Sequence, residues 1–251
     1  MGKFKLKKCP FCNSDLIYSN SNQNEEINTT SEEHIIPKSL GNDILVLKKG
    51  IVCDKCNNYF ALNIEKPFLE MEPIKLIRAY HLIESRKKKV PQFDVLLGNE
   101  TAIMHFDKNS NAFHLEVSPE MVAKLYNGYK PSYLISKGIS IEELKNNYNV
   151  SRLLVKIFIE LYLYYDFELM RLDENIDDDF YFTLDKKMQE LVNYVRYGKK
   201  GKIYDYEVYQ TKEIIPYSND DFIANVEFTH DADTLTGITL NLFELQFVLK
   251  L

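Results

Sequence analysis

The chain has 251 residues, of which 45% are hydrophobic and 27% are charged, and its formal net charge at pH 7 is −6. This composition excludes the class of chains that stay disordered through low hydrophobicity and high net charge, and 15 Phe with 17 Tyr can fill a sizeable core. The sequence has no run of about 18 apolar residues, so we expect no membrane-spanning helix.

The first segment, residues 1–12, is basic and reads MGKFKLKKCPFC. A secretory signal has an apolar stretch after its basic start, and this segment has none. We therefore expect a cytoplasmic protein, whose cysteines lie in a reducing compartment.

The four cysteines form two pairs with the spacing Cys-x2-Cys, namely Cys9 with Cys12 and Cys53 with Cys56. Disulfides are rare in a reducing cytosol, whereas two such pairs can offer four thiolates to one tetrahedral Zn²⁺. The sequence therefore predicts a structural zinc site, which holds a small fold together and does no chemistry itself. The alternative is two unrelated pairs that are redox-active or simply buried.

The segment between the cysteine pairs begins with a polar stretch, residues 19–26, that is typical of an exposed loop. An apolar run over residues 44–53 then predicts two short strands with a turn between them. Beyond the second pair, apolar residues at spacings of four predict a helix with one apolar face. These residues are Phe60, Ile64 and Phe68.

Glu33 and His34 lie at the end of a predicted strand, and Asn57 follows the second cysteine pair at the start of the predicted helix. If one zinc ion binds all four cysteines, Asn57 faces the strand that carries the other two residues. A carboxylate and a carboxamide oxygen can bind a hard divalent cation, while a neighbouring imidazole takes a proton from water. This is the geometry of a one-metal phosphodiesterase. The alternatives are ordinary surface residues at positions 33 and 34 and a helix cap at Asn57.

Together these motifs resemble the HNH endonuclease family of the zinc-bearing ββα-metal type. The resemblance covers about residues 7–70 and rests on the cysteine pairs, Glu33-His34-Ile-Ile-Pro37, Gly41 and Asn57. It implies that His34 is the general base and that Glu33 and Asn57 bind a catalytic Mg²⁺ or Mn²⁺. It also implies that the four cysteines hold the structural zinc.

One position departs from the family pattern. The middle Asn of the family lies a few residues before the second cysteine pair, where this chain has Leu47-Lys48-Lys49-Gly50. Asn42 is the nearest candidate for the role of that residue, which orients the loop bearing the histidine. The departure bears more on the rate than on the reaction type.

Charge is divided unevenly along the chain. Residues 1–90 hold 15 Lys and Arg against 11 Asp and Glu, whereas the remainder holds 16 against 26. Basic runs at residues 3–8 and 86–89 flank the predicted site and suit sequence-independent phosphate contacts, although a charged run is also typical of a solvated face. The residues predicted to contact nucleic acid are Lys38, Arg86, Lys87, Lys88 and Lys89.

The rest of the chain alternates strand and helix patterns. Strands are predicted at residues 90–98, 101–108, 112–118, 204–210, 224–230 and 236–251. Helices are predicted at residues 119–128, 140–166 and 184–198, and an acidic loop at residues 172–179.

We predict an α+β protein with a zinc-bearing nuclease module at residues 1–72 and a mixed helix and antiparallel-sheet domain at residues 73–251, with a subdivision near residue 135. The expected activity is metal-dependent hydrolysis of DNA, with RNA as an alternative substrate, in bacterial or phage defence or restriction. The acidic C-terminal domain is expected to bind a protein partner or a second copy. The rival hypothesis is a catalytically decayed zinc-ribbon module that serves as an adaptor for nucleic acid or protein.

Overall fold

The computed structural model describes most of the chain. The described residues are 6–17, 27–85, 87–136, 140–172, 185–198, 202–211, 224–232 and 234–251. Arg86, residues 3–5 of the first basic run, the polar stretch at 19–26 and the acidic loop beyond residue 172 lie outside them. Helices and antiparallel sheets are both present, which confirms the predicted α+β class.

The N-terminal part contains two very short strands. Strand β1 (Glu33–His34) pairs antiparallel with β2 (Val46–Leu47), and between them lie the 3-10 turn η1 (Lys38–Leu40) and Gly41, whose φ of 85° favours glycine. The second strand expected within residues 44–53 is absent. The chain turns there instead, with the amide of Ile51 donating to the carbonyl of Lys48.

One long helical stretch follows the second cysteine pair. It consists of α1 (Asp54–Phe60), the π-helical turn η2 (Ala61–Glu65) and α2 (Lys66–Leu69), which follow one another without a break. The predicted apolar face is confirmed, because Phe60, Ile64 and Phe68 are all buried. Pro67 has no N–H to donate to the carbonyl of Asn63 one turn earlier. That carbonyl accepts a hydrogen bond from Arg152 instead.

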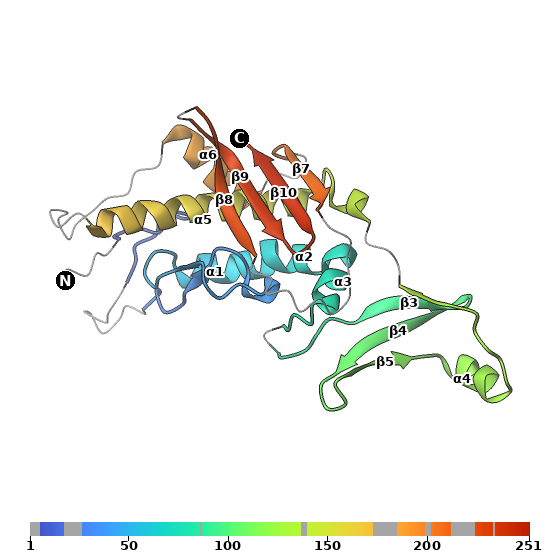
Figure 1. Ribbon diagram of the computed structural model, residues 1–251. Helices are drawn as coiled ribbons and strands as arrows, with labels where there is room; N and C mark the ends of the chain where they lie inside the picture. The colour runs from blue at the N-terminus through green and yellow to red at the C-terminus, as the bar shows by residue number, and fades with distance from the viewer. Residues whose placement is uncertain are drawn as a thin grey trace.

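A second, smaller sheet follows helix α3 (Glu72–Tyr80). Its strands are β3 (Phe93–Leu97), β4 (Glu100–Asp107), β5 (Ala112–Glu116) and β6 (Leu134–Ser136), in the order β5-β4-β3-β6. Helix α4 (Pro119–Tyr126) begins as predicted, with the Ser118 hydroxyl accepting from the amide of Met121. In Figure 1 this sheet extends away from the rest of the molecule, with α4 at its far end.

The C-terminal part places a long helix beside a four-stranded sheet (Figure 1). The helices are η3 (Ile141–Leu144), α5 (Tyr148–Leu172) and α6 (Lys186–Tyr197). The strands are β7 (Tyr206–Gln210), β8 (Asn225–Asp231), β9 (Thr234–Leu242) and β10 (Leu245–Lys250), in the order β7-β10-β9-β8. The final strand β10 therefore lies inside the sheet, between β7 and β9.

The described residues form two hydrophobic clusters. The larger cluster takes buried residues from 6–77 and from 144–249, so the N-terminal part shares one core with α5, α6 and the C-terminal sheet. Phe68 of α2, for example, packs edge-on against Phe247 of β10. The smaller cluster lies between α3 and the second sheet and includes Leu76 and Phe93. The predicted domain bounds at residues 72 and 135 remain predictions.

None of the described helices combines the length and the apolar character that a membrane span requires.

Candidate metal centre and active site

The four cysteines converge on one point. Their sulfur atoms all lie within 4.8 Å of one another, and those of Cys12 and Cys53 are 3.6 Å apart. Tetrahedral ligands at a Zn–S distance of about 2.3 Å lie about 3.8 Å from each other, so the arrangement fits one zinc ion. Hydrogen bonds from the neighbouring thiols, the largest from Cys53, lower the pKa of Cys12, whereas hydrogen bonds within the same group and burial raise the pKa of Cys9 and of Cys56.

Two local structures bring these cysteines together. After Cys9 the chain turns back, with the amide of Asn13 donating to the Cys9 carbonyl and Asn13 in the left-handed region at φ 58°. Cys53 is the N-cap residue of α1, and Cys56 lies in the first turn of that helix. The cluster therefore anchors the start of α1.

A cation lies beside this cluster. The guanidinium of Arg196, from α6, lies 4.1 Å from the centre of the Tyr59 ring. Burial disfavours its charged form, but the charge and hydrogen bond of the Cys56 sulfur outweigh burial and raise the pKa of Arg196. A tetrathiolate zinc site carries a net negative charge, so this arginine suits the outer surroundings of the ion.

The start of α1 forms hydrogen bonds with residues 30–32, which lead into β1. The carboxylate of Asp54 accepts hydrogen bonds from the amides of Thr30 and Ser31. Burial opposes ionisation of Asp54, but these bonds outweigh it and lower its pKa. The Nδ2 of Asn57 donates to the carbonyl of Glu32 over 2.9 Å. Asn57 therefore does not cap α1 and turns its amide toward the strand that carries Glu33 and His34.

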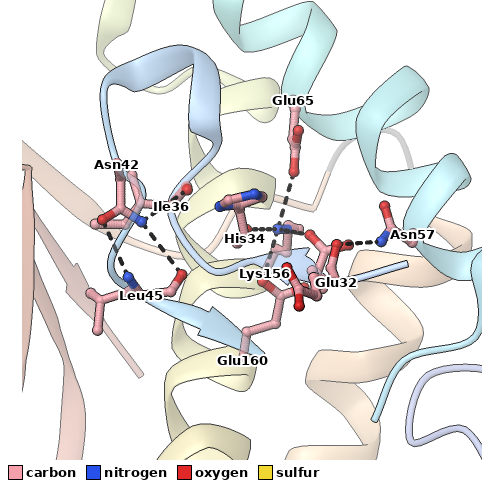
Figure 2. A network of polar contacts seen from close by, with 10 residues as sticks. Glu32, His34, Ile36, Asn42, Leu45, Asn57, Glu65, Lys156 and Glu160 are labelled. Carbon is pink, nitrogen blue, oxygen red and sulfur yellow. Dashed lines mark hydrogen bonds and ion pairs between the residues drawn. The ribbon is translucent and has the colours of Figure 1, made fainter. Parts of the chain in front are cut away.

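Glu33 lies in a buried cluster of charges around Lys156 of α5. Figure 2 shows Lys156 with its other carboxyl partners, Glu65 and Glu160. The Nζ of Lys156 lies 2.7 Å from Glu33 Oε1, 2.8 Å from Glu160 Oε2 and 3.2 Å from Glu65 Oε1. It also donates to the carbonyl of His34 over 3.1 Å. The Lys156 side chain is 0% exposed and that of Glu33 is 4% exposed. One lysine thus binds the side chain of one predicted site residue and the backbone of the next.

The charges of this cluster are unequal, with one lysine facing three carboxyl groups. Burial by itself would neutralise Lys156, but attraction to Glu160, Glu33 and Glu65 outweighs burial and raises its pKa. Burial also raises the pKa of Glu160 well above its usual value. The lysine therefore keeps its proton, and burial favours the protonated form of Glu160.

The side chain of Asn42 forms hydrogen bonds with backbone groups of the loop that follows His34, as Figure 2 shows. Its Nδ2 donates to the carbonyls of Ile36 and Leu45 over 3.3 and 3.4 Å. Its Oδ1 accepts from the amides of Ile44 and Leu45 over 3.3 and 3.4 Å. The side chain is buried, and these contacts suit the loop-orienting role predicted for it.

A cavity of about 740 Å³ lies at part of the predicted basic surface. Lys88 and Lys89 line it together with Lys75, Arg78 and Lys108, against the two acidic residues Glu70 and Asp107. Lys87 is exposed nearby in the chain, and Lys38 forms an ion pair with Asp43 at 2.9 Å. The Nε of Arg78 donates to the carbonyl of Ser39 in η1, so the cavity adjoins the loop after His34.

The structure adds residues that the sequence pattern did not single out. Lys156 and Glu160 lie on α5, and Glu65 lies in the π-helical turn η2. Arg152, one turn before Lys156, donates to the Tyr59 hydroxyl and the Asn63 carbonyl. For the three residues on α5, the only sequence signal is the spacing of four between positions 152, 156 and 160 in an otherwise apolar helix. Among the described residues, the cysteines are the only group of three or more metal-ligating residue types gathered this closely.

Comparison with known proteins gives one match. Residues 9–72 match the family model described as HNH endonuclease. Neither the curated proteins nor the solved structures gave a match. The match begins at the first cysteine of the cluster and ends at the first residue of α3. The N-terminal part of the chain is therefore an HNH endonuclease domain with a four-cysteine cluster.

Proposed function

We propose that the protein is a metal-dependent endonuclease that hydrolyses phosphodiester bonds of DNA, with His34 as the general base. The observation that carries the proposal is the attachment of residues 31 and 32, directly before β1, to the start of α1 through Asp54 and Asn57. This attachment holds the chain directly before Glu33 and His34 against the helix that the cysteine cluster anchors. The family match over residues 9–72 supports the same reaction class.

The residues at this place suit a hard divalent cation. Glu33 offers a carboxylate and Asn57 a carboxamide oxygen, while the Asn57 nitrogen is the atom that contacts Glu32. When bound there, Mg²⁺ or Mn²⁺ supplies charge stabilisation at the scissile phosphate and the leaving oxygen. Zn²⁺ at the four cysteines has a structural role only.

His34 acts on the attacking water. Its imidazole removes a proton as the water attacks the phosphorus atom opposite the leaving oxygen. Strand β1 pairs His34 with Val46 of β2, and Asn42 closes the loop that follows His34. A general base contributes about 10²- to 10⁴-fold in rate.

The basic cavity is the proposed path of the substrate backbone away from the reacting phosphate. Lys88 and Lys89 line the cavity, and Arg78 links it to η1, where Lys38 lies. Lysine contacts to phosphate are independent of sequence, so we propose that these residues set affinity and not the cleavage site.

The proposed biological setting is bacterial or phage defence or restriction. Phage plating on cells that express the wild type or His34→Ala tests this setting.

A plasmid-nicking assay tests the activity. The zinc-loaded protein with Mg²⁺ or Mn²⁺ is expected to nick supercoiled DNA, and EDTA is expected to stop the reaction. His34→Ala should lower the rate about 10²- to 10⁴-fold with zinc content unchanged. His230→Ala, on the exposed side of β8, is the matched control and should cut like the wild type. A wild type that binds DNA without cutting it would instead favour the adaptor hypothesis.

A further inference from the structure

Helix α5 lies outside residues 9–72 and still reaches the proposed active site. Three of its polar residues, Arg152, Lys156 and Glu160, are spaced four apart and therefore share one face of the helix. Two of them contact the N-terminal part, Arg152 through the Asn63 carbonyl and Lys156 through Glu33 and Glu65. The match to the family model thus ends before the residues that complete the surroundings of Glu33.

We propose that Lys156 is a positioning residue for the nuclease site, holding the Glu33 carboxylate and the His34 backbone in the arrangement that the reaction needs. The inference rests on the proposed function and extends it to α5. It places an essential part of the site in the C-terminal half of the chain.

The contacts of Lys156 support this role more than a role in stability alone. Its ammonium group has three hydrogen-bond donors, and four oxygen atoms lie within 3.2 Å of the nitrogen. Two of these oxygens belong to Glu33 and His34, the adjacent residues that carry the proposed chemistry. A buried ion pair adds little net stability compared with apolar residues of similar size, so stability is a weak reason for a lysine here.

The contact of Lys156 with the His34 carbonyl restrains the backbone that carries the imidazole. A two-residue strand such as β1 has few ladder hydrogen bonds to fix it. Lys156 binds the side chain of the first residue and the carbonyl of the second, so it restrains both the position and the rotation of the strand. Groups that hold a metal-binding carboxylate in place typically contribute 10- to 100-fold in affinity or activity.

The test compares Lys156→Met, the double variant Lys156→Met/Glu160→Leu and the control Glu160→Gln. The double variant removes Lys156 together with Glu160, the most deeply buried of its three carboxyl partners, so it leaves fewer unpaired buried carboxyl groups than the single variant does. Glu160→Gln keeps the shape of the side chain and a hydrogen-bond acceptor for Lys156, while Lys156 keeps Glu33. All proteins are compared at equal zinc content and equal circular dichroism.

We expect the double variant to lower kcat for plasmid nicking about 10- to 100-fold with KM for DNA unchanged, because the phosphate contacts lie elsewhere. Glu160→Gln should cut within about threefold of the wild type. A folded double variant that cuts at the wild-type rate would overturn the inference.

A second readout separates this inference from the proposed function. The ¹⁵N-labelled imidazole signal of His34, assigned by its loss in His34→Ala, should shift in the double variant and stay in place in Glu160→Gln. If the wild type cuts no DNA but the signal shifts in this way, the proposed function fails and the positioning role stands. An unmoved signal in the folded double variant overturns the positioning role in either case.

Discussion

The four-cysteine cluster and the Lys156 cluster are both sets of ionisable side chains that meet at one point, but they are assembled differently. The cysteines come from two short motifs inside residues 9–72, and the turns after Cys9 and before α1 bring them together. The Lys156 cluster takes Glu33 and Glu65 from that segment and the other two residues from α5. The first cluster lies wholly within the segment that matches the family, whereas the second joins that segment to α5.

The difference between the two clusters shows where the two halves of the chain depend on each other. The cysteine cluster is built from the N-terminal part, and Arg196 of the C-terminal part lies beside it. The Lys156 cluster cannot form without α5, and the larger hydrophobic core likewise includes residues from both halves. Loss of zinc and loss of Lys156 should therefore have different consequences.

The largest effect is expected for Cys53→Ser. Structural zinc contributes about 10–16 kcal/mol of binding free energy in small zinc domains, and this variant lacks one of the four thiolates. We expect loss of zinc and of the folded N-terminal part, measured as zinc per chain and as helical circular dichroism. Ser14→Ala, whose hydroxyl lies 3.0 Å from the Cys12 sulfur, is the control and should keep its zinc. Wild-type zinc content in Cys53→Ser would contradict a four-cysteine site.

The next effect concerns stability at the Lys156 cluster. Lys156→Met leaves buried carboxyl groups without their cation, so it should lower the free energy of unfolding by about 3–5 kcal/mol. Adding Glu160→Leu removes the most deeply buried of these groups and should recover part of the loss, since Glu33 and Glu65 still lack the cation. Urea unfolding at neutral pH measures both variants. Equal destabilisation in the single and double variants would show that the loss comes from packing and not from charge.

A smaller effect is expected where the two parts meet at the zinc site. Arg196→Gln removes the cation beside Cys56, so zinc should bind about tenfold more weakly, as is typical for groups that surround metal ligands. Competition with a chromogenic chelator measures the affinity. Lys187→Gln, at an exposed position of the same helix, is the matched control. An unchanged affinity would mean that the cysteine cluster is independent of the C-terminal part.

The smallest effect is expected at the cavity. Lys88→Ala/Lys89→Ala should weaken DNA binding a few-fold and lower the slope of log Kd against log salt by up to about 1.8, since each phosphate contact contributes about 0.9. Fluorescence anisotropy over a range of salt concentrations measures the slope. Lys130→Ala/Lys145→Ala, at exposed positions outside the cavity, should leave the slope unchanged.

The local pattern of the sequence was sufficient for most of the elements. Ser118 and Pro119 predicted the start of α4, and Gly198 predicted the end of α6, because caps and glycine act within one turn. The Cys-x2-Cys spacing is local in the same way, because it brings the two sulfurs of each pair together, and the four sulfurs meet in one cluster as predicted. The second strand expected within residues 44–53 was wrong, since the chain turns at Lys48–Ile51 and enters α1 from Cys53. An apolar run does not distinguish a strand from a buried turn.

The sequence by itself therefore determined the two cysteine pairs, the short motif of Glu33 and His34, and most of the helices and strands, because each depends on residues close together in the chain. Only the tertiary structure decided which charges surround Glu33. A lysine in an apolar helix has no preferred partner until packing removes water and leaves one set of carboxylates within reach. Packing of α5 against α2 and η2 brings Lys156 to Glu33, which lies more than a hundred residues earlier in the chain.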